Sequence, residues 1–214
     1  MRLCAILGAV VAAAACSSKR PAEPPPEPAG GRLVFEDKFE RSKLGDDWRD
    51  TSEGAYRIVE GELRARGARN HPLWLKRELP RDVRVELTAR STSPAVDIKI
   101  ELFGDGSSHA ERASYTATSY VLILGGWNNS RSIIARMNEH GDDRVARTAP
   151  RAEPNRRYAF SVTRRGERLT WSLDGEKFLS MEDAQPLVGP SHEHFAFNNW
   201  ESEVFFDDLA IYAL

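Results

Sequence analysis

Apolar and polar residues alternate along much of this chain. Residues 83–90 read Val-Arg-Val-Glu-Leu-Thr-Ala-Arg, with an apolar residue at every second position, and residues 96–102 repeat the pattern. Residues 158–164 and 168–173 continue it with aromatic and aliphatic side chains. A period of two with β-branched residues predicts strands that bury one face and leave the other to water. Because no long stretch has a helical period, the sequence predicts an all-β fold.

Turn residues separate these predicted strands at short intervals. Three pairs, Glu60-Gly61, Arg165-Gly166 and Asp174-Gly175, each stand between two strand-like runs. Such pairs favour hairpins because tight turns need a positive φ, which glycine adopts readily. Prolines also fall between the apolar runs, where a missing amide hydrogen is tolerated. Many short strands without interleaved helices indicate an antiparallel sandwich or barrel.

The N-terminal segment differs in composition from the rest of the chain. Residues 1–15 carry one basic residue followed by a short run of apolar and small residues, which is typical of a secretory signal and too short to span a bilayer stably. Residues 16–31 are rich in proline, which favours an extended tether. We therefore expect a signal peptide at 1–15, a tether at 16–31 and one folded domain at 32–214.

The small residues before Cys16 resemble the bacterial lipoprotein lipobox, although Ala13 stands where that motif usually has leucine. The resemblance implies that Cys16 becomes the new N-terminus and carries a lipid in the bacterial cell envelope. Ser17 is not the aspartate linked to inner-membrane retention, which implies the outer membrane. The alternative is an ordinary cleavage site and simple secretion. Since Cys4 would leave with the signal, we expect no disulfide in the folded domain.

The charge balance excludes one class of partner. The chain has 30 Lys and Arg residues against 32 Asp and Glu residues, a formal net charge of −2, and the two signs are interspersed. Nucleic-acid binding normally requires a basic stripe, so we expect no nucleic-acid partner. No apolar run after the N-terminal segment approaches membrane length, so we expect membrane contact through the lipid anchor only.

Two short segments place Trp beside Asn at the end of a predicted strand. Residues 120–137 read as a strand, a Gly-Gly break, a polar loop and a second strand, and residues 195–200 repeat the Asn-Asn and Trp elements. Sugars pack their C–H faces on indole, their hydroxyls match amides, and Arg can clamp an acidic sugar. The alternative is that these are ordinary turn residues and core tryptophans. The predicted ligand-binding residues are Trp127, Asn128, Asn129, Arg131, Arg136, Asn199 and Trp200.

Three further segments together resemble one known superfamily. Residues 33–48, with Leu-Val-Phe-Glu-Asp-Lys-Phe before Leu-Gly-Asp-Asp-Trp, resemble the opening of concanavalin A-like lectin/glucanase domains. Residues 56–63 resemble the hairpin that follows, and residues 204–214 the closing strand, including that of bacterial domains named for 3-keto-disaccharide hydrolysis. The resemblance implies a jelly-roll sandwich of two antiparallel sheets whose termini pair. It also implies that any sugar is bound on the concave sheet or its rim loops, although some members are interaction modules.

The carboxylates give no recognisable catalytic pair. Asp97 and Glu101 share one face of a predicted strand, but four residues place their backbones about 13 Å apart, whereas glycosidases need about 5 to 9.5 Å between carboxyls. Lys99 also stands where the family 16 glucanases of this superfamily have a carboxylate. If the strands are neighbours, the charges of residues 84–90 and 97–101 would simply form cross-strand pairs. Asp207-Asp208 would point to opposite faces of a regular strand.

No metal or cofactor site is signalled either. His192 and His194 share a face if they lie on a strand, but two ligands are fewer than a normal transition-metal site has. Asp105, Asp142 and Asp143 offer oxygens without the spacing of a calcium loop, which leaves only a structural calcium ion open. We therefore expect no cofactor.

Together these features predict a cell-envelope lipoprotein with a non-catalytic, lectin-like β-sandwich that binds a glycan or another polar ligand. One alternative is a glycoside hydrolase or polysaccharide lyase with an unrecognised site, which would need a carboxylate partner from a neighbouring strand. Another is a structural module that binds a protein partner through the tryptophan-bearing loop.

Overall fold

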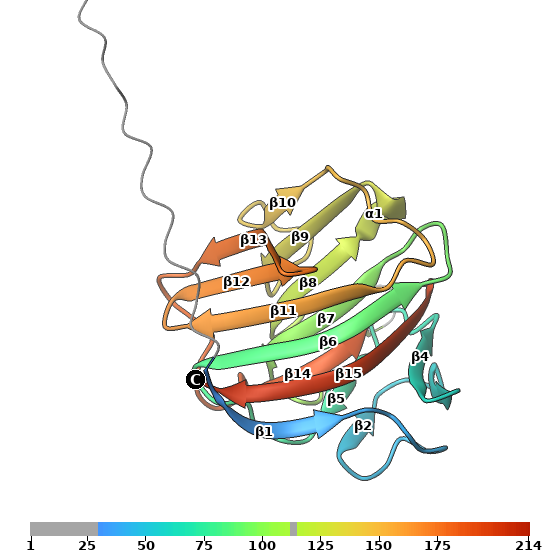
Figure 1. Cartoon of the computed structure of the whole chain (residues 1–214). Coiled ribbons are helices and arrows are strands. Elements are labelled where there is room, and N and C mark those ends of the chain that lie inside the picture. The colour runs from blue at the N-terminus through green and yellow to red at the C-terminus, as the bar shows by residue number, and fades with distance from the viewer. Residues whose placement is uncertain (1–29, 112–114) are drawn as a thin grey trace, which may run out of the picture.

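The computed structural model describes residues 30–111 and 115–214, and in them two antiparallel sheets pack face to face (Figure 1). Eight strands form one sheet in the order β13 (Glu176–Glu182), β12 (Arg168–Leu173), β11 (Tyr158–Arg165), β6 (Val83–Ser91), β15 (Glu203–Ala213), β4 (Glu62–Arg66) and β3 (Tyr56–Val59), with β1 (Arg32–Asp37) also paired to β15. Seven form the other in the order β10 (Val145–Arg147), β9 (Arg131–Arg136), β8 (Tyr120–Gly125), β7 (Ile98–Gly104), β14 (His194–Asn198), β5 (Leu73–Leu75) and β2 (Trp48–Asp50). The predicted all-β sandwich is therefore confirmed.

The core lies between the two sheets. Every second residue of β6 is buried, beginning with Val83, and these side chains meet Ile98, Ile100 and Leu102 of β7 in one large apolar cluster. Burying one such aliphatic side chain stabilises the fold by about 1.5–3 kcal/mol. The alternation seen in the sequence thus defines which face of β6 is inside.

The three predicted hairpin turns are present. Gly61 joins β3 to β4, Gly166 joins β11 to β12, and Gly175 joins β12 to β13, each with a positive φ between 55° and 83°. A Cβ added at Gly166 or Gly175 would meet no atom within 4 Å. Glycine is therefore favoured there by its backbone conformation and not by lack of space.

The two ends of the described domain pair with each other. β1 runs antiparallel to β15, with Arg32 opposite Ala213, as the resemblance implied. A bulge interrupts β15 between Asp207 and Ala210, and Asp208 has a φ of 52°. The strand is therefore irregular at Asp207-Asp208, so the expectation stated for a regular strand does not apply there.

The prediction that one face of the strand at residues 96–102 is exposed to water is wrong. Every residue of β7 and of β8 is buried, on both faces. β6 and β7 also lie in different sheets, so their charges do not pair; Arg84 instead pairs with Glu86, and Arg90 with Glu62. Loops cover the outward face of the seven-stranded sheet, which is the face that carries the candidate site.

Three expectations fall wholly or mostly on residues 1–29. Cys16, the signal peptide and most of the proline-rich tether lie outside the residues that the structure describes. Within residues 30–111 and 115–214, no helix is long and apolar enough to cross a membrane.

Candidate functional site

A strained turn follows β8 and carries the first tryptophan of the site. In this turn, α1 (Gly126–Asn129), the residues Trp127, Asn128 and Asn129 all have left-handed dihedrals, with φ of 50°, 57° and 58°. A left-handed conformation costs an L-residue roughly 1–2 kcal/mol, less for Asn than for Trp. Such strain persists only where the surroundings enforce it, and it concentrates at functional sites.

Contacts from both sides hold this turn in place. The side chain of Asn129 donates to the carbonyl of Ala152 at 2.7 Å, and the amide of Gly125 donates to the hydroxyl of Ser132 at 3.1 Å. Trp127 therefore projects over the outward face of the sheet. There it packs on an apolar cluster formed by Ala117, Val121, Ile123, Ile133 and Ala135.

A second tryptophan follows β14 on the other side of the site. Trp200 is 46% exposed, and its backbone amide donates to Asp97 at 2.6 Å. The neighbouring Asn199 is fully buried; its side-chain oxygen accepts from the amide of Ala68 at 2.9 Å, and its amide group donates to the carbonyl of Ser202. Asn199 thus fixes the loop that presents Trp200.

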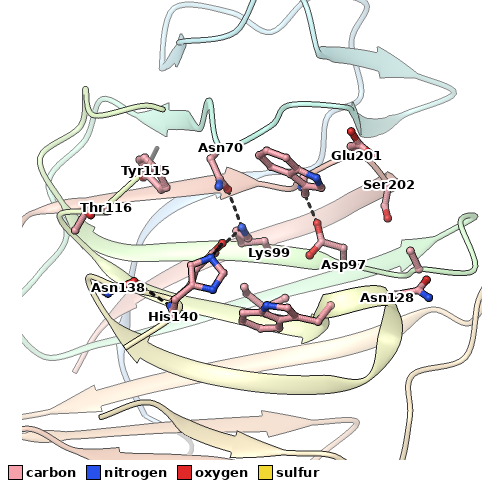
Figure 2. A pocket seen from close by; sticks show the side chains of 15 residues that line it. Asn70, Asp97, Lys99, Tyr115, Thr116, Asn128, Asn138, His140, Glu201 and Ser202 are labelled. Carbon is pink, nitrogen blue, oxygen red and sulfur yellow. Dashed lines mark hydrogen bonds and ion pairs between the residues drawn. The ribbon is translucent and has the colours of Figure 1, made fainter. Parts of the chain in front are cut away.

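The two tryptophans lie on opposite sides of β7 because β7 is hydrogen-bonded to β8 on one side and to β14 on the other. Between them is a pocket of about 810 Å³ (Figure 2). Its lining combines two indoles with carboxylates, amides, hydroxyls and one ammonium group: Asn70, Ala95, Asp97, Lys99, Tyr115, Thr116, Ile123, Trp127, Asn128, Asn138, Glu139, His140, Trp200, Glu201 and Ser202.

Lys99 lies at the floor of the pocket with its side chain only 2% exposed. Its ammonium donates to Glu139 Oε2 and to Asn70 Oδ1, each at 2.7 Å (Figure 2). Burial acts to lower the pKa of Lys99, but the nearby carboxylates of Glu139 and Asp97 outweigh it and hold that pKa above its ordinary value. The ammonium is therefore charged at neutral pH, and it donates to two acceptors.

Glu101 is buried deeper on the same face of β7. Its carboxylate accepts from the hydroxyl of Tyr115 at 2.9 Å, from the hydroxyl of Ser119 at 2.5 Å and from the amide of Asn198 at 2.7 Å. Burial raises the pKa of Glu101 above its ordinary value despite these donors. Glu101 is fully buried and serves to fix Tyr115 over the sheet.

Asp97 is a partly exposed carboxylate of the pocket. It immediately precedes β7, and burial raises the pKa of its carboxyl while Lys99 and the amide of Trp200 oppose that shift. Together with Glu139 and the amide side chains, it offers hydrogen-bond acceptors between two flat apolar surfaces. This combination suits a ligand with apolar faces and hydroxyl edges.

The structure brings together three of the residues predicted from sequence: Trp127, Asn128 and Trp200 line the pocket. Arg131 lies beside it, with its guanidinium 5.5 Å from the Trp127 ring. Arg136 points elsewhere, as it bonds to Asp183 at 3.0 Å and to the carbonyl of Gln185 at 3.2 Å.

The remaining two predicted residues, Asn129 and Asn199, hold the loops that present the tryptophans. Sequence reasoning missed several lining residues, namely Asn70, Lys99, Tyr115, Glu139 and His140. One feature of the sequence did indicate that the outward face of the seven-stranded sheet is covered. Val121 and Ile123 are apolar at positions that would be wet in a one-sided strand, which is typical of a strand covered on both faces.

Three of the candidate metal ligands that were considered from the sequence are hydrogen-bonded to backbone groups. His192 and His194 each use Nδ1 to bond a backbone carbonyl, of Thr118 at 2.8 Å and of Leu75 at 2.9 Å. Asp105 accepts from the amides of Ser107 and Ser108. No group of three or more His, Cys, Asp or Glu side chains is placed to hold a metal ion in the part of the chain that the structure describes.

Comparison with known proteins gives one relative and many similar structures. No family model matches the chain. It is 25% identical over 162 residues to an extracellular exo-alpha-L-arabinofuranosidase of Streptomyces chartreusis, a match that covers 74% of this chain but only 18% of that protein. The chain thus corresponds to less than a fifth of that relative.

Two solved structures illustrate the shared fold. The carbohydrate-binding module CBM66 of Bacillus subtilis superposes with a TM-score of 0.60 at 11% identity, covering 80% of this chain and 98% of the module. The laminarinase catalytic domain of Thermotoga maritima superposes with a TM-score of 0.59 at 13% identity, covering 86% and 98% of the two chains. The domain therefore has the concanavalin A-like lectin/glucanase fold, as the sequence resemblance predicted.

Proposed function

We propose that this domain binds a carbohydrate in the outward pocket of the seven-stranded sheet. The observation that carries the proposal is the placement of Trp127 and Trp200 on opposite sides of β7, with Asp97 and Lys99 between them. Strands lie about 4.8 Å apart, so two strand spacings separate the flanking strands by about 9.6 Å at the backbone. Such a span leaves room for one sugar ring between two indoles, given contacts of about 3.5–4 Å on each side.

The chemistry of the lining supports a sugar more than a purely apolar ligand. A volume of about 810 Å³ falls in the range of small-molecule sites. The amides of Asn128 and Asn138 can each donate and accept, and the carboxylate of Asp97 accepts from hydroxyl groups. The left-handed turn at Trp127 is further support, because strained backbone conformations concentrate at functional sites.

A glycan array tests this proposal. The full chain should bind at least one class of glycan, and Trp127→Ala and Trp200→Ala should each lose that binding while keeping the circular dichroism spectrum of the parent. Leu33→Ala is a matched control because Leu33 is also a large exposed apolar residue, 44% exposed, but lies on β1 in the other sheet. Equal loss in all three variants, or no loss in either tryptophan variant, would contradict the proposed site.

Hydrolysis of a glycoside is a second candidate function. Two pocket carboxylates, Asp97 and Glu139, lie close enough to Lys99 for both to raise its pKa, and burial raises the pKa of Asp97 as it does for many general acids. The Streptomyces relative carries the name of an arabinofuranosidase. Incubation with aryl arabinofuranosides and laminarin oligosaccharides should then release product, and Asp97→Asn should abolish turnover. Binding without release would favour the non-catalytic function.

We also propose that the domain is tethered to the bacterial cell envelope, on the outer membrane, through a lipid on Cys16. Support comes from the sequence alone: the signal-like residues 1–15, the small residues before Cys16 and the proline-rich residues that follow. Metabolic labelling with an alkyne fatty acid should mark the chain, and Cys16→Ser should remove the label and release the protein from the membrane fraction. A protein partner at the tryptophan-bearing loop would be the remaining alternative if the glycan array is negative.

A further inference from the structure

The outward face of the seven-stranded sheet is not an open groove. In the described residues, β7 and β8 are buried along their whole length, and β14 is buried except at His194. The outward cluster around Val121 and Ile123 is covered by the side chains of Trp127 and Tyr115. A polysaccharide lying across this face would have to displace those side chains.

Tyr115 closes one end of the pocket. Along β7, the outward positions run from Asp97 beside the pocket mouth, through Lys99 at its floor, to Glu101, which is 0% exposed. The hydroxyl of Tyr115 bonds to both oxygens of Glu101, at 2.9 and 3.1 Å, so the ring is fixed over the strand where a groove would otherwise continue. The carboxylate in turn accepts hydrogen bonds from Ser119 and Asn198, which hold it in position.

The rest of the rim surrounds the floor. Apart from the floor residues, the lining residues come from six separate segments, at residues 70, 95–97, 115–116, 127–128, 138–140 and 200–202. Figure 2 shows Asn70, Tyr115, His140 and Asn128 placed around Lys99. The floor itself consists of Lys99 and Ile123, each 2% exposed. A pocket that is closed at the Tyr115 end and has a small floor accepts one end of a ligand more readily than its middle.

We infer that the pocket recognises the terminal sugar of a glycan chain and not an internal one, with Tyr115 as the residue that sets this preference. This inference rests on the proposed function, because it assumes that the ligand is a carbohydrate. An internal sugar is linked to a neighbouring sugar on each side, so the glycan chain would have to leave the pocket at two ends. The hydrogen-bonded pair of Tyr115 and Glu101 closes one of these ends. The bound sugar therefore has one free end inside the pocket and continues into solvent through the mouth beside Asp97.

Binding of the full chain to a matched ligand series tests the inference. The affinities of the chain for arabinan-, laminarin- and cellulose-derived oligosaccharides, from disaccharide to hexasaccharide, are measured by calorimetry. Binding is then measured to the same oligosaccharides immobilised through either chain end. Affinity should change by less than about twofold with length, because added sugars lie outside the pocket. Attachment through one end should abolish binding, while attachment through the other should preserve it.

Variants of Tyr115 test whether its ring sets the preference for chain ends by closing the pocket, as distinct from a role in folding. Tyr115→Ala removes the wall, so its affinity should rise with ligand length, whereas Tyr115→Phe keeps the ring and should keep the preference for chain ends. If Tyr115→Ala does not fold, the immobilisation series with the unaltered chain decides. An affinity that rises more than about tenfold with length in the unaltered chain, or equal binding from both attachments, would overturn the inference and leave sugar binding intact. Failure to bind any glycan would overturn both.

Discussion

Replacing Glu139 with alanine should destabilise the folded domain by about 3 kcal/mol. The side chain of Lys99 is 2% exposed, and among the described residues its ammonium has two partners within hydrogen-bond distance, Glu139 and Asn70, each at 2.7 Å. Removing one partner of a buried ion pair costs about 3–5 kcal/mol because the other charge is left uncompensated. Glu139 is 13% exposed beside the pocket, where water can partly replace it, so we expect the lower end of that range.

Urea unfolding at neutral pH, followed by tryptophan fluorescence, measures this loss. Glu201→Ala is the matched control, since Glu201 is a pocket carboxylate whose pair with Arg69 is mostly exposed, at 58% and 63%, and is worth about 0–1 kcal/mol. The double variant Lys99→Met with Glu139→Gln should recover most of the lost stability, because no unpaired buried charge remains. A loss in Glu139→Ala no larger than in Glu201→Ala would refute the reasoning.

Three further predictions concern pH, backbone strain and ligand charge. Burial opposes ionisation of Asp37, but hydrogen bonds from Arg41 and the Trp48 indole lower its pKa, so its stabilisation is present above about pH 4 and lost as the pH falls further. Asp37→Asn should therefore lower the free energy of unfolding at pH 7 by about 2–4 kcal/mol, seen as a lower melting temperature. Its melting temperature should also depend less on pH between pH 7 and pH 3 than that of the parent. The same pH dependence in parent and variant would contradict this. Asn128→Gly should raise the free energy of unfolding by about 0.5–1 kcal/mol in the same urea assay, because glycine adopts the left-handed conformation without strain, and a decrease would argue against strain in the turn. A hexuronate should bind about tenfold more weakly by calorimetry than the matching neutral hexose, because acidic side chains outnumber Lys99 in the lining, and tighter binding of the hexuronate would count against the proposed lining.

The fold was largely predictable because its signals are local. Alternation over residues 83–90 defines which side of β6 is buried, and the glycine turns at residues 61, 166 and 175 each join neighbouring strands. What alternation does not reveal is the order of strands. Residues 84–90 and 97–101 look like neighbours in the sequence, yet β6 and β7 lie in opposite sheets.

The site was only partly predictable for a related reason. Trp127 and Trp200 stood out because each follows a predicted strand with amides beside it, and both line the pocket. Lys99 appeared to be on a solvated face, because polar residues at alternate positions look the same whether water or loops cover them. Glu139 and Tyr115, which cover that face, lie on loops distant in sequence and share no motif with β7.

The most direct test of the central claim is a titration of the indole N–H signals by NMR. The chain has five tryptophans, and three of them are buried in the sandwich or beneath loops: Trp48, Trp74 and Trp171. On addition of a glycan selected by the array, the account predicts that the signals of Trp127 and Trp200 shift together while the other three stay in place. A glycan that binds without shifting either of those two signals would contradict a sugar site on the outward face of β7.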